Sequence, residues 1–178
     1  ARNFIDSLFT LFCLGLVVAS AIIFWFVPIL SAWFFPGFSP AELTQLVVLT
    51  RILLLSPFLL GLSNMLAAVT QSVNRFLVYA MSPVLYNLGI IAGVLLFYPW
   101  LGLPGLAVGV VLGAFLHFAI QWPVVMAVGL MPRLIWPIRD WPMVRAVLVV
   151  SVPRTITLAA HQITMLVLIA QASLMAVG

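Results

Sequence analysis

The feature that most constrains this chain is a succession of long apolar stretches separated by short connectors. Each stretch exceeds the roughly 20 residues that an α-helix needs to cross the hydrocarbon core of a bilayer. No stretch alternates with a period of two residues over the length of a barrel strand. The sequence therefore predicts an all-α fold, a polytopic transmembrane helix bundle. Its five spans cover about residues 8–35, 43–72, 77–98, 103–130 and 143–173.

The composition agrees with a membrane protein. Of the 178 residues, 66% are hydrophobic and 6% are charged, whereas roughly 25% are charged in a soluble domain. The net charge of +4 comes from seven arginines. Because these arginines are scattered singly, with no basic cluster, the charge does not indicate nucleic-acid binding. Membrane lipids are the partners that the composition predicts.

Residues for catalysis or metal binding are sparse. The three acidic residues, Asp6, Glu42 and Asp140, all lie in or beside connectors, and Cys13 is the only cysteine. The two histidines are far apart and lack carboxylates nearby, so no zinc site is indicated. An enzyme would need a nucleophile with a base, a carboxylate pair or a metal cluster. We therefore expect no catalytic activity, no metal and no cofactor.

The arginines predict an orientation. Alternate connectors share one side of the membrane, which places the N-terminus, the turn at 72–76 and the loop at 131–142 together. The connectors at 36–42 and 98–105 lie on the other side and carry no arginine. By the positive-inside rule, the arginine-bearing side is cytoplasmic. Its arginines are Arg2, Arg75, Arg133, Arg139 and Arg145.

Glycines predict a packing surface between the third and fourth spans. Gly105, Gly109 and Gly113 recur at steps of four, and Gly89 and Gly93 do the same on the preceding span. In lipid, small residues at this spacing let two helix backbones approach closely. We expect these glycines to have a structural role.

The second span carries a polar face and an arginine. We expect Pro57 to kink this helix, since proline removes a backbone hydrogen bond. Two interpretations of the face remain: it lines a cavity or moving interface, or its amides join helices by hydrogen bonds. Arg51 lies off this face, and it either reaches the outer interface or contacts substrate. The face consists of Pro57, Gly61, Asn64, Ala68 and Gln71.

The fifth span has the longest polar stripe. Such a stripe must face other helices or a hydrated cavity, and we favour a cavity because the other spans offer few polar partners. Arg154, which follows Pro153, would be its cationic point and suits a phosphate. His117 and Gln121 on the fourth span either join this cavity or bond each other. The stripe consists of Ser151, Arg154, Thr157, His161, Thr164, Leu168 and Gln171.

Several segments of the chain are distinctive when taken together. They are FFPGFSP at 34–40, LTRILLLSPFLLGLS at 49–63, QSVNRFLVYAMSPVLYNLGIIAG at 71–93, HFAIQWP at 117–123, MPRLIWP at 131–137 and VPRTITLAAHQITMLVLIAQASLMAVG at 152–178. These segments cover nearly the whole chain, and in this order they resemble one family, the MurJ (MviN) lipid II flippases of the multidrug/oligosaccharidyl-lipid/polysaccharide exporter superfamily.

The resemblance implies a piece of a fourteen-helix, two-lobe transporter, of which the five spans would be helices 3–7. Residues 1–130 would belong to the N-terminal lobe, 131–142 would be the cytoplasmic inter-lobe loop, and 143–178 would open the C-terminal lobe. The implied activity is movement of lipid II, a lipid-linked pyrophosphate saccharide, between leaflets of the bacterial plasma membrane by alternating access. The family's best-known cavity arginines belong to helices 1, 2 and 8, so Arg51 and Arg154 inherit no role.

Two rival functions remain. The first is a flippase for another polyprenyl-linked saccharide. The second is a structural membrane protein whose polar stripe on the fifth span only packs against helices. In every case we expect the remaining helices of a longer chain to be partners of this one.

Overall fold

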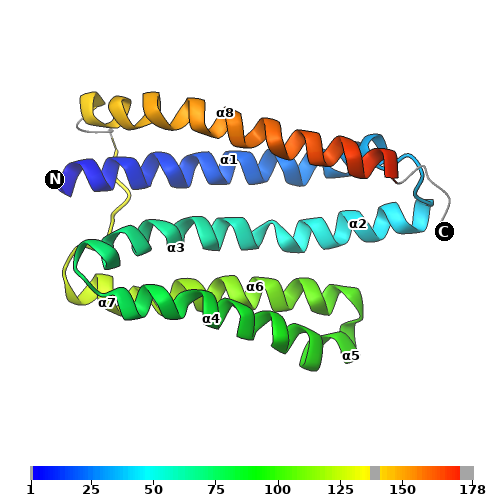
Figure 1. Ribbon diagram of the computed structural model, residues 1–178, viewed down its shortest axis with the longest axis horizontal. Helices are drawn as coiled ribbons and strands as arrows, with labels where there is room; N and C mark the ends of the chain where they lie inside the picture. Colours follow the sequence, from blue (N-terminus) through cyan, green and yellow to red (C-terminus); the bar gives the residue numbers. More distant parts are fainter. Residues whose placement is uncertain (1, 137–140, 173–178) are drawn as a thin grey trace.

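The computed structural model describes residues 2–136 and 141–172. Within these residues the chain is helical throughout and contains no strand (Figure 1). In chain order the elements are α1 (Arg2–Phe34), α2 (Pro40–Leu53), α3 (Leu55–Ser72), α4 (Phe76–Ala92), the π-helical segment η1 (Gly93–Phe97), α5 (Tyr98–Leu101), α6 (Leu103–Ala119), α7 (Trp122–Ala127) and α8 (Trp141–Ala172).

These elements form five spans that are long and apolar enough to cross a membrane, as the sequence predicts. The first begins at Arg2, a few residues earlier than expected, and the remaining boundaries lie close to those predicted. The spans are Arg2–Phe34, Pro40–Ser72, Phe76–Leu101, Leu103–Ala127 and Trp141–Ala172.

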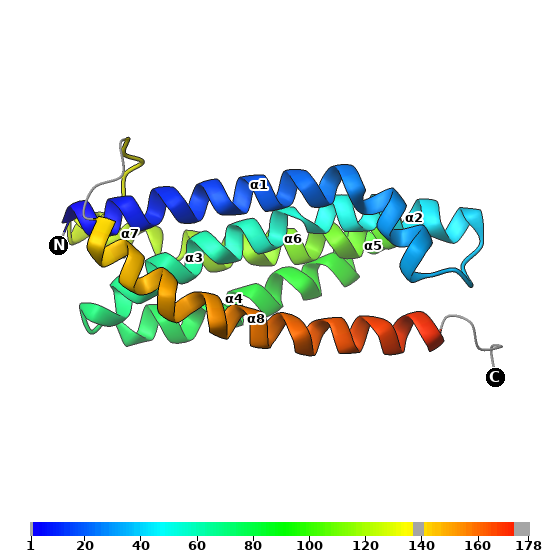
Figure 2. The ribbon, with the colours of Figure 1, turned by 90° about the horizontal axis from the view of Figure 1, so that it is seen from above.

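The spans lie side by side in a layered order. Figure 1 shows α8 next to α1, α1 next to the α2–α3 helix, and α4 with α6 on the far side. Helix α6 contacts both α3 and α4, whereas α8 contacts only α1 among the described elements. Figure 2 shows that the middle part of α8 lies away from α1. The α8 helix is therefore the least attached part of the bundle.

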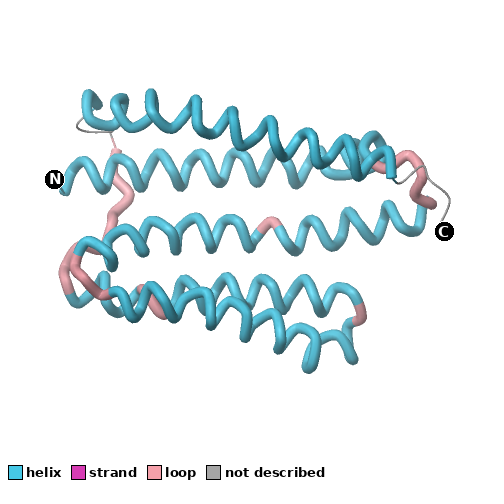
Figure 3. Tube along the Cα trace, in the orientation of Figure 1, coloured by secondary structure: helices cyan, strands magenta, loops and turns pink. Residues whose placement is uncertain are grey.

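The α2–α3 span is interrupted at one residue. The break is at Leu54, between Leu53 and Leu55. Figure 3 shows it as a short pink segment within the long α2–α3 helix. Pro57 explains the position, because its missing N–H leaves the Leu53 carbonyl without its i+4 donor. The expected effect of Pro57 is confirmed as a local break in the helix.

The start of this span is fixed by a capping box. The Ser39 amide donates to Glu42 Oε2 at 2.7 Å, and the Glu42 amide donates to Ser39 Oγ at 3.4 Å. Pro40 occupies the first turn, where its missing N–H has no partner to lose. Glu42, which the sequence places beside a connector, therefore helps to cap the N-terminus of α2.

A second proline, Pro83, lies in the interior of a helix, where its missing N–H removes a backbone hydrogen bond. The first turn is the position where proline costs no backbone hydrogen bond. The structure starts α4 at Phe76 and leaves Pro83 in its interior. The Asn74-Arg75 turn before it explains why: Asn74 has a φ of 56°, a left-handed conformation that asparagine tolerates. The turn therefore sets the start of the helix at Phe76, ahead of the proline.

The α4–α6 contact is the tightest in the bundle, as the glycine spacing predicts. A Cβ built on Gly93 would lie 2.7 Å from the Cα of Gly109, and one on Gly113 would collide with the Tyr86 carbonyl oxygen. Gly89 meets Gly113 in the same way. Because no side chain fits between them, the two backbones touch directly. Gly93 is the first residue of the π-helical segment η1, which also contacts α6.

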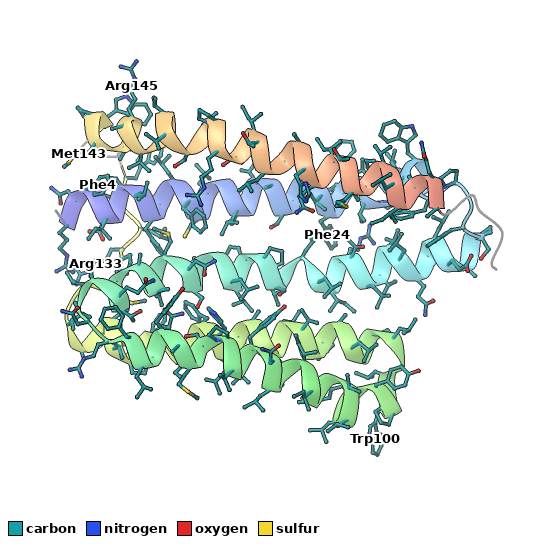
Figure 4. The ribbon with its side chains drawn as sticks, viewed as in Figure 1. Phe4, Phe24, Trp100, Arg133, Met143 and Arg145 are labelled. Carbon is teal, nitrogen blue, oxygen red and sulfur yellow. The ribbon has the colours of Figure 1, made fainter. Side chains whose placement is uncertain are left out.

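The arginine-bearing connectors gather at one end of the molecule. Figure 1 shows the N-terminus, the α3–α4 turn and the start of α8 at the same end. Arg2, Arg75, Arg133 and Arg145 belong to these segments, whereas Arg139 lies outside the described residues. Figure 4 shows Arg145 projecting away from the bundle. The asymmetry expected from the sequence is thus present in space.

Candidate functional site

A long groove runs between α1, α3 and α8. One cavity of about 560 Å³ lies between α1 and α3, and a second of about 520 Å³ extends from the same walls to α8. The two share Leu8, Phe12 and Met65 as lining residues, so they are adjacent, and we call them together the α1–α3–α8 groove. Its walls are mainly apolar, with polar groups contributed by α3 and α8.

The α3 wall of the groove comes from the polar face predicted on the second span. Gly61, Asn64 and Ala68 all line it, while Pro57 and Gln71 do not. Gln71 instead donates from Nε2 to the Ala67 carbonyl of its own helix at 3.2 Å. A Cβ on Gly61 would lie 3.0 Å from both Leu16 and Phe12. The face therefore contacts α1 and presents one amide, Asn64, to the cavity.

The α8 wall comes from Ser151 and Thr155. Ser151 is part of the predicted stripe, whereas Thr155 is not. Thr155 was missed because the stripe continues from Ser151 through Arg154, three residues on, and so leaves out Thr155, which is four residues after Ser151. Its hydroxyl donates to the Ser151 carbonyl at 2.9 Å, which keeps an acceptor lone pair available. Ser151 and Thr155 are the only polar residues that α8 contributes to the described groove.

The rest of the α8 stripe lies elsewhere. Gln171 lines a small cavity of about 220 Å³ with Trp33, Phe34 and Pro36 at the end of α1. The other members are exposed and line none of these cavities. They are Arg154, Thr157, His161, Thr164 and Leu168. Whether this face borders a cavity in a larger assembly stays a prediction.

The hydroxyls and charges on this face differ in their local partners. Thr157 donates to the Pro153 carbonyl at 3.1 Å and Thr164 to the Ala160 carbonyl at 3.0 Å. The Pro153 ring breaks one backbone bond of α8 at this level. Among the described residues, no ion pair or side-chain hydrogen bond holds Arg154 or His161. A guanidinium on an apolar helix without a partner is costly in lipid and is by default a functional candidate.

Arg51 lies in a separate pocket, away from the α1–α3–α8 groove. Its guanidinium carbon is 4.6 Å from the centre of the Phe24 ring, a cation–π geometry. The pocket has a volume of about 640 Å³ and is walled by α1, the Leu54 break and α6. Figure 4 labels Phe24 on the α1 helix above this break. Arg51 therefore joins α1 to α2, and the structure does not bring it near Arg154.

His117 and Gln121 belong to a buried polar cluster with Ser63. The Ser63 hydroxyl lies 2.7 Å from His117 Nδ1 and 2.9 Å from the His117 carbonyl oxygen. Gln121 Nε2 donates to Ser63 Oγ at 2.6 Å and to the His117 carbonyl at 3.2 Å. Ser63 and Gln121 are fully buried. His117 and Gln121 thus both bond Ser63, Gln121 also bonds the His117 carbonyl, and neither residue lines the groove.

Ser63 is the residue of this cluster that sequence reasoning missed. It lies one position before Asn64, on the other side of α3, and a lone serine in an apolar span carries no distinctive spacing. The overlooked signal is the buried face formed by Ser56, Ser63 and Thr70 at steps of seven. Hydrogen bonds of this kind fasten membrane helices together, so the cluster ties α3 to α6.

Taken together, the fold and the groove define a multi-pass helical membrane protein with the features of a transporter: several spans, an inter-helix cavity and polar groups inside an apolar bundle. Comparison with known families identifies which one. The family model described as lipid II flippase MurJ matches residues 1–178. The chain belongs to this family, and the resemblance noted from the sequence is confirmed.

A curated relative supports the same family. The chain is 32% identical over 77 residues to a protein of Borreliella burgdorferi named probable lipid II flippase MurJ. The match covers 43% of this chain and 15% of that protein. The chain therefore matches only a small part of its relative's length. Membership in a transporter family fits a protein that catalyses no reaction.

Proposed function

We propose that this chain forms part of a lipid II flippase, which moves a lipid-linked peptidoglycan precursor from the inner to the outer leaflet of the plasma membrane. The observation that carries this proposal is the family match over residues 1–178. In the same proposal the arginine-bearing end is cytoplasmic, by the positive-inside rule. Residues 1–130 belong to one lobe, 131–142 link the lobes, and 143–178 begin the second.

The mechanism we propose is alternating access, and the attachment of α8 supports it. Helix α8 contacts the bundle only through α1 within the described chain, and the groove lies between the two. A helix with so few neighbours can shift relative to α3 without disturbing the glycine-packed α4–α6 pair. Opening the groove at one end and closing it at the other would expose Asn64, Ser151 and Thr155 in turn.

The polar stripe of α8 is the proposed head-group contact. Arg154 supplies a charge that stays ionised and a forked donor set that matches phosphate oxygens. Ser151, Thr157, His161, Thr164 and Gln171 supply neutral donors and acceptors along the same helix. A pyrophosphate moving across the membrane would meet this series of polar groups. Arg51, Asn64, Gln71, His117 and Gln121 are secondary; of these, Asn64 alone lines the groove.

The test is translocation of lipid II by the full-length protein reconstituted in vesicles. Replacing Arg154 with alanine removes the cation, and we expect the rate to fall by about tenfold or more, as for loss of a charge-assisted contact. Arg154→Lys should retain part of the rate, because it keeps the charge without the fork. Arg145→Ala is the matched control, since Arg145 lies on the same helix and projects away from the bundle.

Two outcomes would contradict parts of the proposal. An Arg154→Ala protein with the wild-type rate would remove Arg154 from the head-group contact. A wild-type protein that moves another polyprenyl-pyrophosphate saccharide but leaves lipid II in place would assign a different substrate.

A further inference from the structure

The connector that follows α7 is attached to the bundle by both apolar packing and hydrogen bonds. Leu130 and Met131 pack against the buried cluster of Leu66, Val69 and Val125. The chain then crosses from α3 to α1, with Pro132 buried on the way. Figure 4 shows Arg133 at the end of the bundle where α1 begins. Residues 130–135 have no regular secondary structure, so their backbone amides need other partners.

Two side chains of α1 supply these partners. The amide of Arg133 donates to Asp6 Oδ1, and the amide of Ile135 donates to Thr10 Oγ1, both at 2.9 Å. The Thr10 hydroxyl in turn donates to the Asp6 carbonyl oxygen at 2.8 Å. Asp6 is only 5% exposed. A carboxylate this buried must be hydrogen-bonded to be tolerated, so the contact with Arg133 is part of what keeps it there.

The spacing of the two contacts fits their geometry. Asp6 and Thr10 are four residues apart, which is about 6 Å along an α-helix. Arg133 and Ile135 are two residues apart, which is about 6.6 Å in an extended chain, and alternate amides of such a chain point to the same side. Leu134, between them, is 68% exposed. One face of α1 thus accepts hydrogen bonds from two alternate amides of the connector.

We propose that Asp6 and Thr10 are positioning residues that clamp the first half of the connector, residues 131–135, onto α1. The clamped segment moves with the α1–α7 bundle, so any displacement of α8 begins beyond Ile135. Within the described chain α1 therefore contacts both α8 and the connector that precedes it, and so links the position of one to that of the other. This inference rests on the proposed transport function and assigns two residues that act on it from outside the groove.

The first measurement is hydrogen exchange at single amides in the full-length protein in lipid nanodiscs. In the wild type the Arg133 and Ile135 amides should be protected. Asp6→Ala should speed exchange at Arg133 by about tenfold or more, and Thr10→Val should do the same at Ile135. Asp6→Asn and Thr10→Ser keep the accepting oxygen and should retain most of the protection.

Thr44→Val is the matched control. Thr44 is also a helical threonine whose hydroxyl donates to a carbonyl four residues back, that of Pro40, at 2.8 Å, but it holds no connector. Its replacement removes the same intrahelical bond and should leave both amides protected. Equal exchange at Arg133 and Ile135 in the wild type, Asp6→Ala and Thr10→Val proteins would overturn the clamp.

The second measurement is lipid II translocation by the same variants. We expect Asp6→Ala and Thr10→Val to slow translocation by severalfold, and Asp6→Asn and Thr10→Ser to restore it. Faster exchange with an unchanged rate would show a clamp without a positioning role and would overturn the proposal. A wild type that exchanges as expected but moves no lipid II would instead refute the transport function, so the two failures are distinguishable.

Discussion

Polar residues at the α3–α6 interface and on helix α8 differ in their hydrogen-bond partners. At the interface, Ser63, His117 and Gln121 bond one another, and two of the three are fully buried. On α8, Arg154 and His161 have no side-chain partner among the described residues, and the threonines bond only their own helix. In lipid, a polar group that is already bonded between helices fastens the fold. One without such a bond is available for a ligand.

The same contrast holds for helix attachment. The α4–α6 pair is joined at backbone distance through glycines, whereas α8 contacts the described bundle through α1 alone. A tight pair and a loosely attached helix in one molecule suit a transporter in which one part moves against another. Two changes test this contrast and a third tests a contact outside both regions; they follow from the largest expected effect to the smallest.

The largest effect is expected at Gly113. In Gly113→Ala the new Cβ would collide with the backbone oxygen of Tyr86, which cannot give way as a flexible side chain would. We expect the free energy of unfolding to fall by about 2–3 kcal/mol, measured by steric trapping in bilayer discs. Gly15→Ala is the control, because nothing lies within 4 Å of its built Cβ. An equal loss in both variants would remove the special status of the α4–α6 contact.

A smaller effect is expected at Ser63. Its replacement by alanine leaves Gln121 Nε2 and His117 Nδ1 without their shared partner in a buried site. The free energy of unfolding should fall by about 1–2 kcal/mol. The same measurement on Thr164→Val, whose hydroxyl bonds only its own helix, should show a change below about 0.5 kcal/mol. If the α8 variant proved the less stable of the two, the contrast between the regions would be reversed.

The smallest effect is expected at Arg51 and Phe24. The cation–π contact should contribute about 0.5–1 kcal/mol, as the coupling energy in a double-mutant cycle of Arg51→Ala and Phe24→Leu. A role confined to packing would leave lipid II translocation unchanged in Arg51→Ala. A translocation rate that falls while stability changes little would instead place Arg51 on the substrate path.

Much of the fold could be predicted from the sequence because the lipid environment imposes strong rules. Apolar length gave the five spans, the spacing of Gly89, Gly93 and Gly109 predicted the α4–α6 contact, and Pro57 predicted the break at Leu54. These signals lie within one helix or repeat along it. They can be read without knowing which helix is the neighbour.

The candidate site was harder to predict for the same reason. The 3–4 spacing placed Ser151 and Arg154 on one stripe, but only the position of α1 decides that Ser151 and Thr155 line the groove. Asp6 carries no periodic signal, and the seven-residue spacing of Ser63 with Ser56 and Thr70 does not indicate its partner. The importance of Ser63 and Asp6 depends on residues more than fifty positions away in the chain. Sequence spacing identifies faces of helices, whereas the partner of each face comes from the fold.

The π-helical segment η1 has a consequence for how this span tolerates changes in length. A π-helical turn holds about one residue more than the α-helical turn it replaces. Removing one residue between Gly93 and Phe97 would return the segment to α-helix and leave the flanking helices nearly aligned. The same deletion within α4 would rotate everything beyond it by about 100° and turn Gly89 away from Gly113. The span therefore has one short segment that can absorb a deletion, and it lies between two backbone contacts that tolerate no change of register, Gly93 with Gly109 and Phe97 with Gly105.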